Sequence, residues 1–402
     1  MSEWKTYRLG DLCDSISNTY RGKAQNVVLI NTSDVLEGKC LNHRKEPNKN
    51  LKGQFKKTFQ QGDILYSEIR PSNKRFAYID FDATDYIAST KLMVLRANEK
   101  IRPLYLYYIL QSQVVIDELQ MLAESRSGTF PQITFSELSL LTTELPDIDS
   151  QDKIINILKS LDDKIELNRR INANLEAQAQ ALFRSWFVDF EPFRDGPFVD
   201  SELGKIPQGW KVGTINEIIQ ILSGYAFKSD TFTEAGPYRL ITIKNVQDGS
   251  LNIDGAAYLS EIPDKMPQHC NLTIGDILLS LTGNVGRVCI VDRDGLLLNQ
   301  RVAKLQPKDK RNIFFTYALF RQDSFKQYLI QIAKGTAQLN LSPVETSDTK
   351  IVLPNQDILL QFGGIGQPLF DNIVSNCKEI ITLSALRDTL LPKLMAGEIA
   401  IE

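Results

Sequence analysis

QDKIINILKSLDDKIELNRRINANLEAQAQALFRSWFVDF, residues 151–190, is the stretch around which the chain is built. An apolar residue recurs at every seventh position in the series Ile154, Leu161, Leu175 and Leu182. Asn168 occupies the step missing from that series, and a single buried asparagine in a heptad seam typically fixes the register of a coiled coil. No proline or glycine interrupts the stretch before Pro192, so it predicts one helix of about 40 residues, roughly 60 Å long. A helix of that length needs a partner.

A second stretch, 359–395, repeats this pattern near the other end of the chain. Its seam is formed by Leu369, Asn376, Leu383 and Leu390, each at one constant offset from its counterpart in the first stretch. We therefore expect two copies of one element that pair as an antiparallel coiled coil with Asn168 and Asn376 as its register residues, aligned with each other if the pairing is two-fold symmetric. The alternative is two unrelated amphipathic helices in separate cores.

Matching motifs extend the duplication over the whole chain. WKTYRLGDL at Trp4 corresponds to WKVGTINEI at Trp210, and GDILYSEIR at Gly62 corresponds to GDILLSLTG at Gly275. Each copy therefore predicts an α+β globule of mixed α/β content followed by one long helix. The expected domains are a first globule at 1–150, a long helix at 151–195, a second globule at 196–355 and a second long helix at 356–402.

Within each globule, short strand-like runs alternate with turns. The helical period predicts one further helix in each copy, at 104–121 and at 314–332. The segment 195–210, DGPFVDSELGKIPQGW, is rich in glycine and proline and is expected to be the loop that opens the second copy.

Composition narrows the class of protein. The 402 residues are 43% hydrophobic and 24% charged, as in ordinary globular chains, and no apolar run approaches the roughly 18 residues that span a bilayer. Five cysteines without a C-x-x-C pair suit reduced thiols better than a disulfide framework. We therefore expect a soluble, cytoplasmic protein.

Residue types that carry catalysis are scarce. His43 and His269 are the two histidines, which argues against a histidine triad or a multi-histidine metal site. The sequence lacks the Asn/Asp-Pro-Pro-aromatic tetrapeptide of an adenine methyltransferase and a glycine-rich cofactor loop after a strand. GGIGQPLF, which begins at Gly363, falls inside the second long helix and is expected to be a local weak point or a bend rather than a nucleotide-binding loop. We expect no catalytic residue, metal or cofactor in this chain.

Charge is unevenly distributed. A net charge of −3 and a pI near 5.7 argue against a non-specific DNA coat. Two basic clusters, NHRKEPNKNLKGQFKK at 42–57 and RPSNKR at 70–75, nevertheless provide local positive charge. A local basic face can bind nucleic acid on an acidic protein, although each cluster could equally be a solvated loop.

The connector between the copies carries a family resemblance. RRINANLEAQAQALFRSWFVDFEPF, followed by SELGKIPQGWKV, resembles the central conserved region of specificity (S) subunits of type I restriction-modification systems. SGYAFKS and KGTAQLNLS are similar to loops of that family's second target-recognition domain. The resemblance implies two target-recognition domains that each read half of a bipartite, asymmetric double-stranded DNA site, with paired helices that set the gap. It also implies two methyltransferase (M) subunits docked on the helices, and restriction (R) subunits that complete a nuclease.

On this interpretation, phosphate contacts should come from Lys and Arg on loops, and base contacts from polar side chains at loop tips. In the first copy the candidates are Tyr20, Arg21, Lys23, Arg70, Asn73, Lys74, Arg75, Lys91, Arg126 and Thr129. In the second copy they are Tyr225, Phe227, Lys228, Lys244, Asn245, Asn284, Arg287, Arg301, Lys334, Thr336 and Gln338.

Two other hypotheses remain open on the residues alone. A coiled-coil scaffold that does not read DNA would bind protein partners without sequence-dependent DNA affinity. A stand-alone nuclease or methyltransferase, which the missing motifs disfavour, would require metal-dependent cleavage or cofactor binding by the isolated chain.

Overall fold

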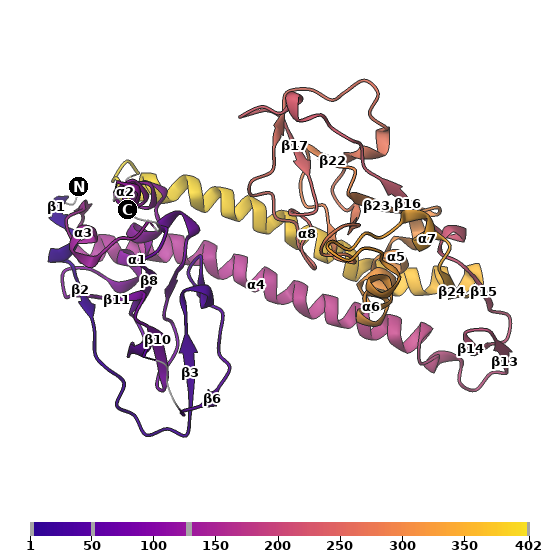
Figure 1. Ribbon diagram of the computed structural model, residues 1–402, viewed down its shortest axis with the longest axis horizontal. Coiled ribbons are helices and arrows are strands. Elements are labelled where there is room, and N and C mark those ends of the chain that lie inside the picture. Colours follow the sequence, from indigo (N-terminus) through magenta and orange to yellow (C-terminus); the bar gives the residue numbers. More distant parts are fainter. Residues whose placement is uncertain (1–3, 50–52, 126–130, 400–402) are drawn as a thin grey trace. The chain divides into compact units, whose positions relative to one another are not determined.

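The computed structural model describes residues 4–49, 53–125 and 131–399 (Figure 1). Contacts divide the chain into two units. The first consists of Met1–Asp163 with Leu383–Glu402, and the second is Lys164–Thr382. Each unit therefore combines one globule with a segment of each long helix.

The first unit contains two four-stranded sheets. One is antiparallel with the order β2-β11-β8-β9, and the other has the order β6-β3-β10-β7, in which β3 and β10 are parallel. Two-stranded pairs join β1 to β12 and β4 to β5. The strands are β1 (Lys5–Arg8), β2 (Cys13–Ile16), β3 (Asn26–Ile30), β4 (Val35–Leu36), β5 (Lys39–Cys40), β6 (Glu46–Pro47), β7 (Phe55–Lys57), β8 (Ile64–Ser67), β9 (Phe76–Tyr78), β10 (Tyr86–Ser89), β11 (Leu92–Ala97) and β12 (Thr142–Leu145). The helices of this globule are α1 (Pro103–Gln111), α2 (Gln113–Glu124) and α3 (Phe135–Leu138).

The second unit repeats this topology. Its sheets have the orders β16-β23-β20-β21 and β18-β17-β22-β19, and β15 pairs with β24 as β1 pairs with β12. The strands are β13 (Phe198–Ser201), β14 (Gly204–Pro207), β15 (Lys211–Thr214), β16 (Ile219–Ser223), β17 (Tyr238–Ile241), β18 (Tyr258–Leu259), β19 (Asn271–Leu272), β20 (Ile277–Ser280), β21 (Val288–Ile290), β22 (Leu296–Leu298), β23 (Val302–Pro307) and β24 (Lys350–Leu353). Its helices are α5 (Ile313–Arg321), α6 (Asp323–Ile332) and α7 (Pro343–Ser347). The same strand order in both units confirms the tandem duplication.

The GDIL motif builds the same turn in both units. Its glycines have φ of +89° and +92°, the left-handed region that glycine adopts without strain. Asp63 accepts a hydrogen bond from Nε of Arg96 on the neighbouring strand at 2.7 Å, and Asp276 lies 2.8 Å from Nζ of Lys304. The motif is therefore structural: it fixes where β8 and β20, inner strands of the antiparallel four-stranded sheet of each unit, begin.

The two long helices are α4 (Ile148–Phe187) and α8 (Gln356–Met395), and both are continuous. In the second unit, Lys164 lies 3.5 Å from Glu379, and Nδ2 of Asn172 donates to the carbonyl of Ile373 at 3.3 Å. Partners further along α4 thus lie earlier in α8. This confirms the antiparallel pairing.

The two seam asparagines are not aligned with each other, so that part of the expectation is wrong. Asn168 is buried, and its Nδ2 donates to Glu379 at 2.8 Å. Asn376 instead donates to Oδ1 of Asn172 at 2.8 Å, one helical turn further along α4. Each asparagine therefore meets a different polar residue, and the polar layer extends over more than one turn.

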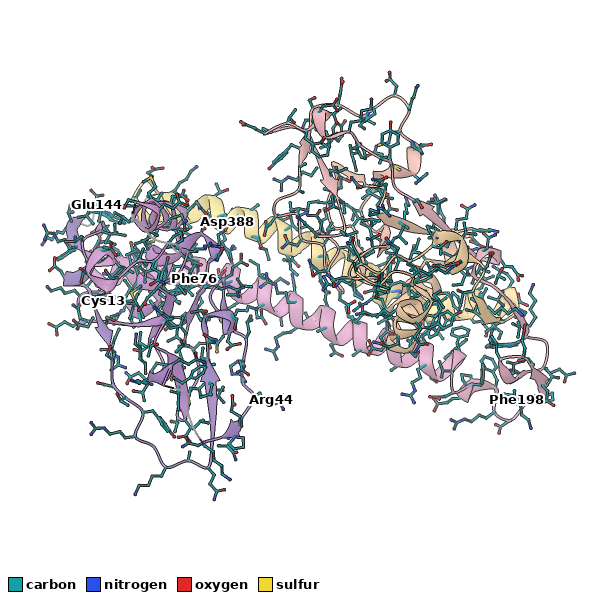
Figure 2. The ribbon with its side chains drawn as sticks, viewed as in Figure 1. Cys13, Arg44, Phe76, Glu144, Phe198 and Asp388 are labelled. Carbon is teal, nitrogen blue, oxygen red and sulfur yellow. The ribbon has the colours of Figure 1, made fainter. Side chains whose placement is uncertain are left out.

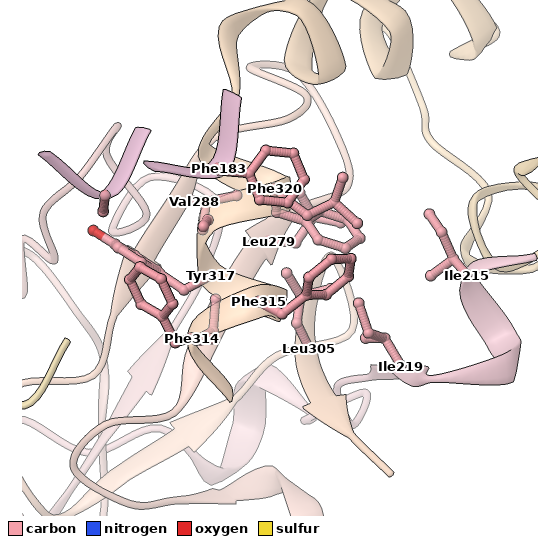
Figure 3. Close-up of a cluster of buried hydrophobic side chains, with 14 of the residues drawn as sticks. Phe183, Ile215, Ile219, Leu279, Val288, Leu305, Phe314, Phe315, Tyr317 and Phe320 are labelled. Carbon is pink, nitrogen blue, oxygen red and sulfur yellow. The ribbon is translucent and has the colours of Figure 1, made fainter. Parts of the chain in front are cut away.

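Aromatic packing attaches the second globule to its helix segments. Phe183 of α4 packs against Phe315 of α5 with ring centroids 5.5 Å apart (Figure 3). Phe187 lies 4.7 Å from Phe362 of α8, and Phe190 lies 5.6 Å from Trp210. The aromatic end of the connector is therefore part of the globule's core.

Glycines in GGIGQPLF permit close packing rather than a break. Gly366 lies within the continuous helix α8, and a Cβ atom there would meet the ring of Phe314 at 1.8 Å. Gly364 faces open space. Helix α8 runs through this segment without interruption, and Gly366 lets it approach α5 closely.

Two other local expectations need correction. The single helices expected at 104–121 and 314–332 are each split, because Ser112 and Gln322 adopt extended backbone with ψ of 141° and 127°. The Ser112 hydroxyl also accepts a hydrogen bond from the N–H of Val115, which starts α2. The expected loop at 195–210 contains the β13–β14 hairpin.

Exposed side chains surround both globules, including Arg44 in the loop before β6 (Figure 2). Over the described ranges, no helix combines the length and apolarity needed to cross a bilayer.

Candidate nucleic-acid interface

In the second unit, candidate residues meet at one end of the β16-β23-β20-β21 sheet. The loop after β20, the turn before β23 and the loop after α6 lie side by side there. The N–H of Leu281 donates to the carbonyl of Arg301 at 3.1 Å, and the N–H of Gly283 donates to the carbonyl of Leu339 at 2.9 Å. These backbone hydrogen bonds join the three loops into one edge, which we call the second loop edge.

Exposed polar side chains occupy this edge and its neighbourhood. On the edge itself they are Asn284, Arg301, Lys334, Thr336 and Gln338, and the candidates Lys228 and Lys244, in the loops after β16 and β17, are exposed as well. Lys334 also forms an ion pair with Glu345. The remaining side chains provide the mixture of cations and amide or hydroxyl groups that contacts phosphates and base edges.

The loop after α6 is a constrained hairpin. The N–H of Lys334 donates to the carbonyl of Asn340 at 2.9 Å, and the reverse hydrogen bond is 2.7 Å. Gly335 has φ of +123°, and a Cβ atom there would lie 2.2 Å from the carbonyl oxygen of Gln338. Thr282 donates to Oδ1 of Asn340 at 2.8 Å. These contacts hold the tip of the hairpin in one conformation, as a loop that contacts specific DNA bases requires.

The first unit has an equivalent first loop edge at the same end of its β2-β11-β8-β9 sheet. The N–H of Glu68 donates to the carbonyl of Lys91 at 3.1 Å, and the N–H of Arg70 donates to the carbonyl of Pro131 at 3.1 Å. Arg70 and Lys74 have φ of 45° and 52°. Such left-handed conformations cost on the order of 1–3 kcal/mol outside glycine and cluster at functional sites, which supports this loop as a contact region.

Other first-copy candidates are also accessible. Arg21, Lys23, Arg70, Asn73 and Lys91 are exposed, whereas Lys74 is half-buried. Arg126 and Thr129 lie outside the described residues.

Lys91 and Arg301 occupy the same place in the two copies. Each is exposed in the short turn that precedes β11 or β23. Each backbone carbonyl also accepts the hydrogen bond that holds the neighbouring loop, from Glu68 or from Leu281. A cation repeated at one position suits a phosphate contact that does not depend on sequence.

Asn245 has a structural role that sequence reasoning missed. It is 2% exposed, its Oδ1 accepts from the N–H of Thr242 at 2.9 Å, and its Nδ2 donates to the carbonyl of Asn252 at 2.9 Å. Asp34 accepts the equivalent hydrogen bond from Asn31 in the first copy. The Asn245 side chain is enclosed and already hydrogen-bonded, so we remove Asn245 from the candidates for base contact.

Arg75 and Arg287 are half-buried and brace a neighbouring loop. Nη1 of Arg75 donates to the carbonyl of Ser33 at 3.2 Å, and Nη1 of Arg287 donates to Oε1 of Gln247 at 2.7 Å. Gln247 lies in none of the sequence motifs, so its contact with Arg287 could not be predicted from the sequence. Part of each guanidinium is engaged within its own globule. Arg75 and Arg287 are therefore weaker candidates for DNA contact than Lys91 and Arg301.

The aromatic candidates stabilise their loops. The Tyr20 hydroxyl donates to Oδ1 of Asp85 at 2.6 Å, and burial together with this hydrogen bond raises the pKa of Tyr20. Tyr225 and Phe227 are half-buried and pack edge to face with centroids 5.0 Å apart.

Metal-ligating and nucleophilic side chains are not gathered at this interface. Within the described ranges, no group of three or more His, Cys, Asp or Glu residues is placed to hold a metal ion. The five cysteines are free thiols. Burial raises the pKa of Cys13 to about 12 and that of Cys377 to about 11, so both thiols remain protonated near neutral pH.

Comparison with known proteins identifies the class. The family model described as the type I restriction modification DNA specificity domain matches residues 1–177 and 207–361, once in each copy. The type I restriction enzyme HindI specificity subunit of Haemophilus influenzae is 35% identical over 470 aligned residues, covering 99% of this chain and all of that protein. The MjaIX specificity subunit of Methanocaldococcus jannaschii is 31% identical over 304 residues, covering 74% of this chain and 69% of that protein.

A solved structure agrees in fold. The crystal structure of a type I restriction-modification S subunit from M. genitalium has a TM-score of 0.54 at 18% identity, covering 98% of this chain and 96% of that one.

The match of this family model to each of the two globules identifies a non-catalytic DNA-recognition protein with two target-recognition domains. The chain belongs to the type I restriction-modification DNA specificity family, and it is a specificity subunit.

Proposed function

We propose that the two globules read different halves of one bipartite, asymmetric DNA site through their loop edges, and that α4 and α8 fix the gap. The observation that carries this proposal is a repeated strand order with unlike side chains at equivalent loop positions. Repetition of the scaffold gives two reading heads, and divergence of the loops gives them different sequence preferences. A stiff connection then admits half-sites at one spacing and helical phase.

The domain limits in this proposal follow the sequence repeat. The target-recognition domains are residues 1–150 and 196–355, and the connecting helices are residues 151–195 and 356–402. Each domain supplies base contacts from its loop edge and phosphate contacts from the repeated cation, Lys91 or Arg301.

The chain acts, in this proposal, inside a larger complex. Two methyltransferase (M) subunits dock on the helices and modify adenine in the two half-sites, and restriction (R) subunits add cleavage. This chain recognises DNA through the side chains described above. The M and R subunits supply the catalytic residues.

Selection from a random DNA pool tests this proposal. The chain, assembled with its M subunits, should enrich two constant blocks separated by a constant number of variable base pairs. Replacing the hairpin 334–340 should alter only one block, because it belongs to one loop edge. Enrichment without a gapped motif, or a change in both blocks, would count against the proposal.

A further inference from the structure

A polar network in the second unit begins on α4. Nε of Arg321, the last residue of α5, donates to Oε1 of Glu176 on α4 at 2.8 Å. The hydroxyl of Tyr317 also donates to Glu176. Tyr317 is 2% exposed, so the carboxylate of Glu176 is held at a closely packed contact between α4 and α5.

The network continues through Asp248. Nη1 of Arg321 pairs with Asp248, and Nζ of Lys326 on α6 lies 2.5 Å from the other carboxylate oxygen of Asp248. Asp248 lies in the loop 242–252, the same loop that Asn245 closes from within. Glu176, Arg321 and Asp248 therefore tie this loop to α4, and we call these three residues the clamp.

The clamped loop holds one candidate DNA-contact residue, Lys244, and contacts a second, Arg287. Gln247, next to Asp248, accepts a hydrogen bond from Arg287 at 2.7 Å and donates to the carbonyl of Lys244 at 2.8 Å. The N–H of Gly249 donates to the carbonyl of Val288 at 2.8 Å. A chain of direct contacts thus runs from the long helix to the loops that carry Lys244 and Arg287.

The first unit is attached to its helix segments differently. Tyr108 donates to Asp162 on α4 at 2.9 Å, and Nη1 of Arg387 on α8 donates to the same carboxylate at 3.0 Å. At the end of α1, where the second copy has Arg321 at the end of α5, the first copy has Gln111, which cannot form an ion pair. The clamp is therefore a feature of one copy and not of the repeated scaffold.

The clamp is buried enough to constrain geometry. The side chains of Arg321 and Glu176 are 16% and 20% exposed, and that of Lys326 is 24% exposed. Burial raises the pKa of Asp248, but Lys326 and Arg321 outweigh it and leave that pKa below its ordinary value. Partly desolvated charges of this kind are screened less than surface pairs, and removing one partner leaves another without its counter-charge.

We propose that the Glu176–Arg321–Asp248 clamp is a positioning device that orients the second loop edge on α4 and so determines which half-site spacing the second globule accepts. The inference rests on the proposed function, because spacing has meaning only for a gapped site. The clamp touches no base in this account. It acts through the loops that carry Lys244 and Arg287.

The test uses the complete complex of this chain with its M subunits. Glu176→Gln and Asp248→Asn remove charge at the two ends of the clamp with little change in shape. Glu202→Gln is the matched control, because Glu202 pairs with Lys350 in the same unit with side chains 52% and 56% exposed. Methylation rates are compared on duplexes that carry both half-sites with the native spacer, or with one base pair more or fewer.

Both clamp variants should lower the ratio of the methylation rate at the native spacer to the rate at the altered spacers by about fivefold. That factor is at the lower end of the coupling found between linked sites in proteins. Half-site preference and the control ratio should not change. An unchanged ratio in an assembled complex, or an equal loss of rate at every spacer, would overturn the inference. If Glu176→Gln does not assemble, Asp248→Asn decides alone, because Asp248 is 40% exposed and lies outside the helix seam. Absence of any gapped preference in the unaltered complex would instead refute the proposed function.

Discussion

Tyr105 shows at the scale of one residue how the two copies diverged. It is fully buried in the first globule, and its hydroxyl has no hydrogen-bond partner in the part of the chain that the structure describes. At the equivalent place in α5, the second copy has Phe315, which packs without a hydroxyl. The scaffold therefore accepts either a tyrosine or a phenylalanine ring at this position. The unpaired Tyr105 hydroxyl lowers the stability of the first copy alone.

Tyr105→Phe should raise the free energy of unfolding by about 1 kcal/mol, because a buried polar group without a partner carries a desolvation cost. Tyr108→Phe is the matched control, since its hydroxyl donates to Asp162 at 2.9 Å and its loss should lower stability by about 1 kcal/mol. Urea denaturation of both variants measures the difference. Equal destabilisation by the two changes would show that the Tyr105 hydroxyl has a partner.

Arg301→Ala tests the repeated cation. Losing one phosphate contact should weaken binding to all DNA sequences alike and reduce the slope of log Kd against log salt by about one. Lys308→Ala is the control, because Lys308 is exposed at the opposite end of β23. Fluorescence anisotropy of the assembled complex across a salt series gives both slopes. A selective loss for one DNA sequence would assign Arg301 to base reading instead.

At the scale of elements, the sequence predicted the long helices, which depend on the period of apolar residues. It did not predict the helix breaks, which depend on local hydrogen bonds. The seven-residue spacing predicted α4 and α8, because a heptad seam persists over many turns. The breaks at Ser112 and Gln322 lack a proline or glycine signal and depend on capping and packing. Asn245 looked like a loop-tip reader because sequence does not reveal burial.

Helix α8 contains a close approach that can be tested with two neighbouring glycines. Gly366→Ala should destabilise the second unit by roughly 1–3 kcal/mol, because the added methyl group overlaps the ring of Phe314. Gly364→Ala is the control and should stabilise by up to about 1 kcal/mol, since alanine favours helix and the position faces open space. Thermal unfolding of both variants tests the contrast, and the same sign for both would contradict it.

At the scale of the molecule, duplication supplies two target-recognition domains, and the proposal is that divergence of their loops gives each its own half-site. The repeated elements could be predicted because they recur in the sequence, whereas the clamp could not, because nothing in the sequence pairs Glu176 of the connector with Arg321 and Asp248, which lie 145 and 72 residues further along the chain. The division of the chain at 163/164 and 382/383 places a segment of each long helix in each unit. Each globule therefore packs with a segment of both helices, and those segments connect the two proposed recognition domains.

Lengthening both helices at these positions should change the gap but not the half-sites. Seven residues inserted in each helix preserve the heptad and add roughly 10 Å, the length of about three base pairs. Selection from a random DNA pool should return the same two blocks with a changed spacer. New bases within either block would show that the helices influence reading directly.

The central claim is that this chain gives its partners a gapped, two-part DNA specificity. Mapping methylated adenine at single-base resolution, in cells that express the chain with its M subunit and in cells that express either alone, tests this claim most directly. The account predicts one bipartite motif with a constant gap, present only when both are expressed. Co-purification of the M subunit without any new methylated motif would contradict it.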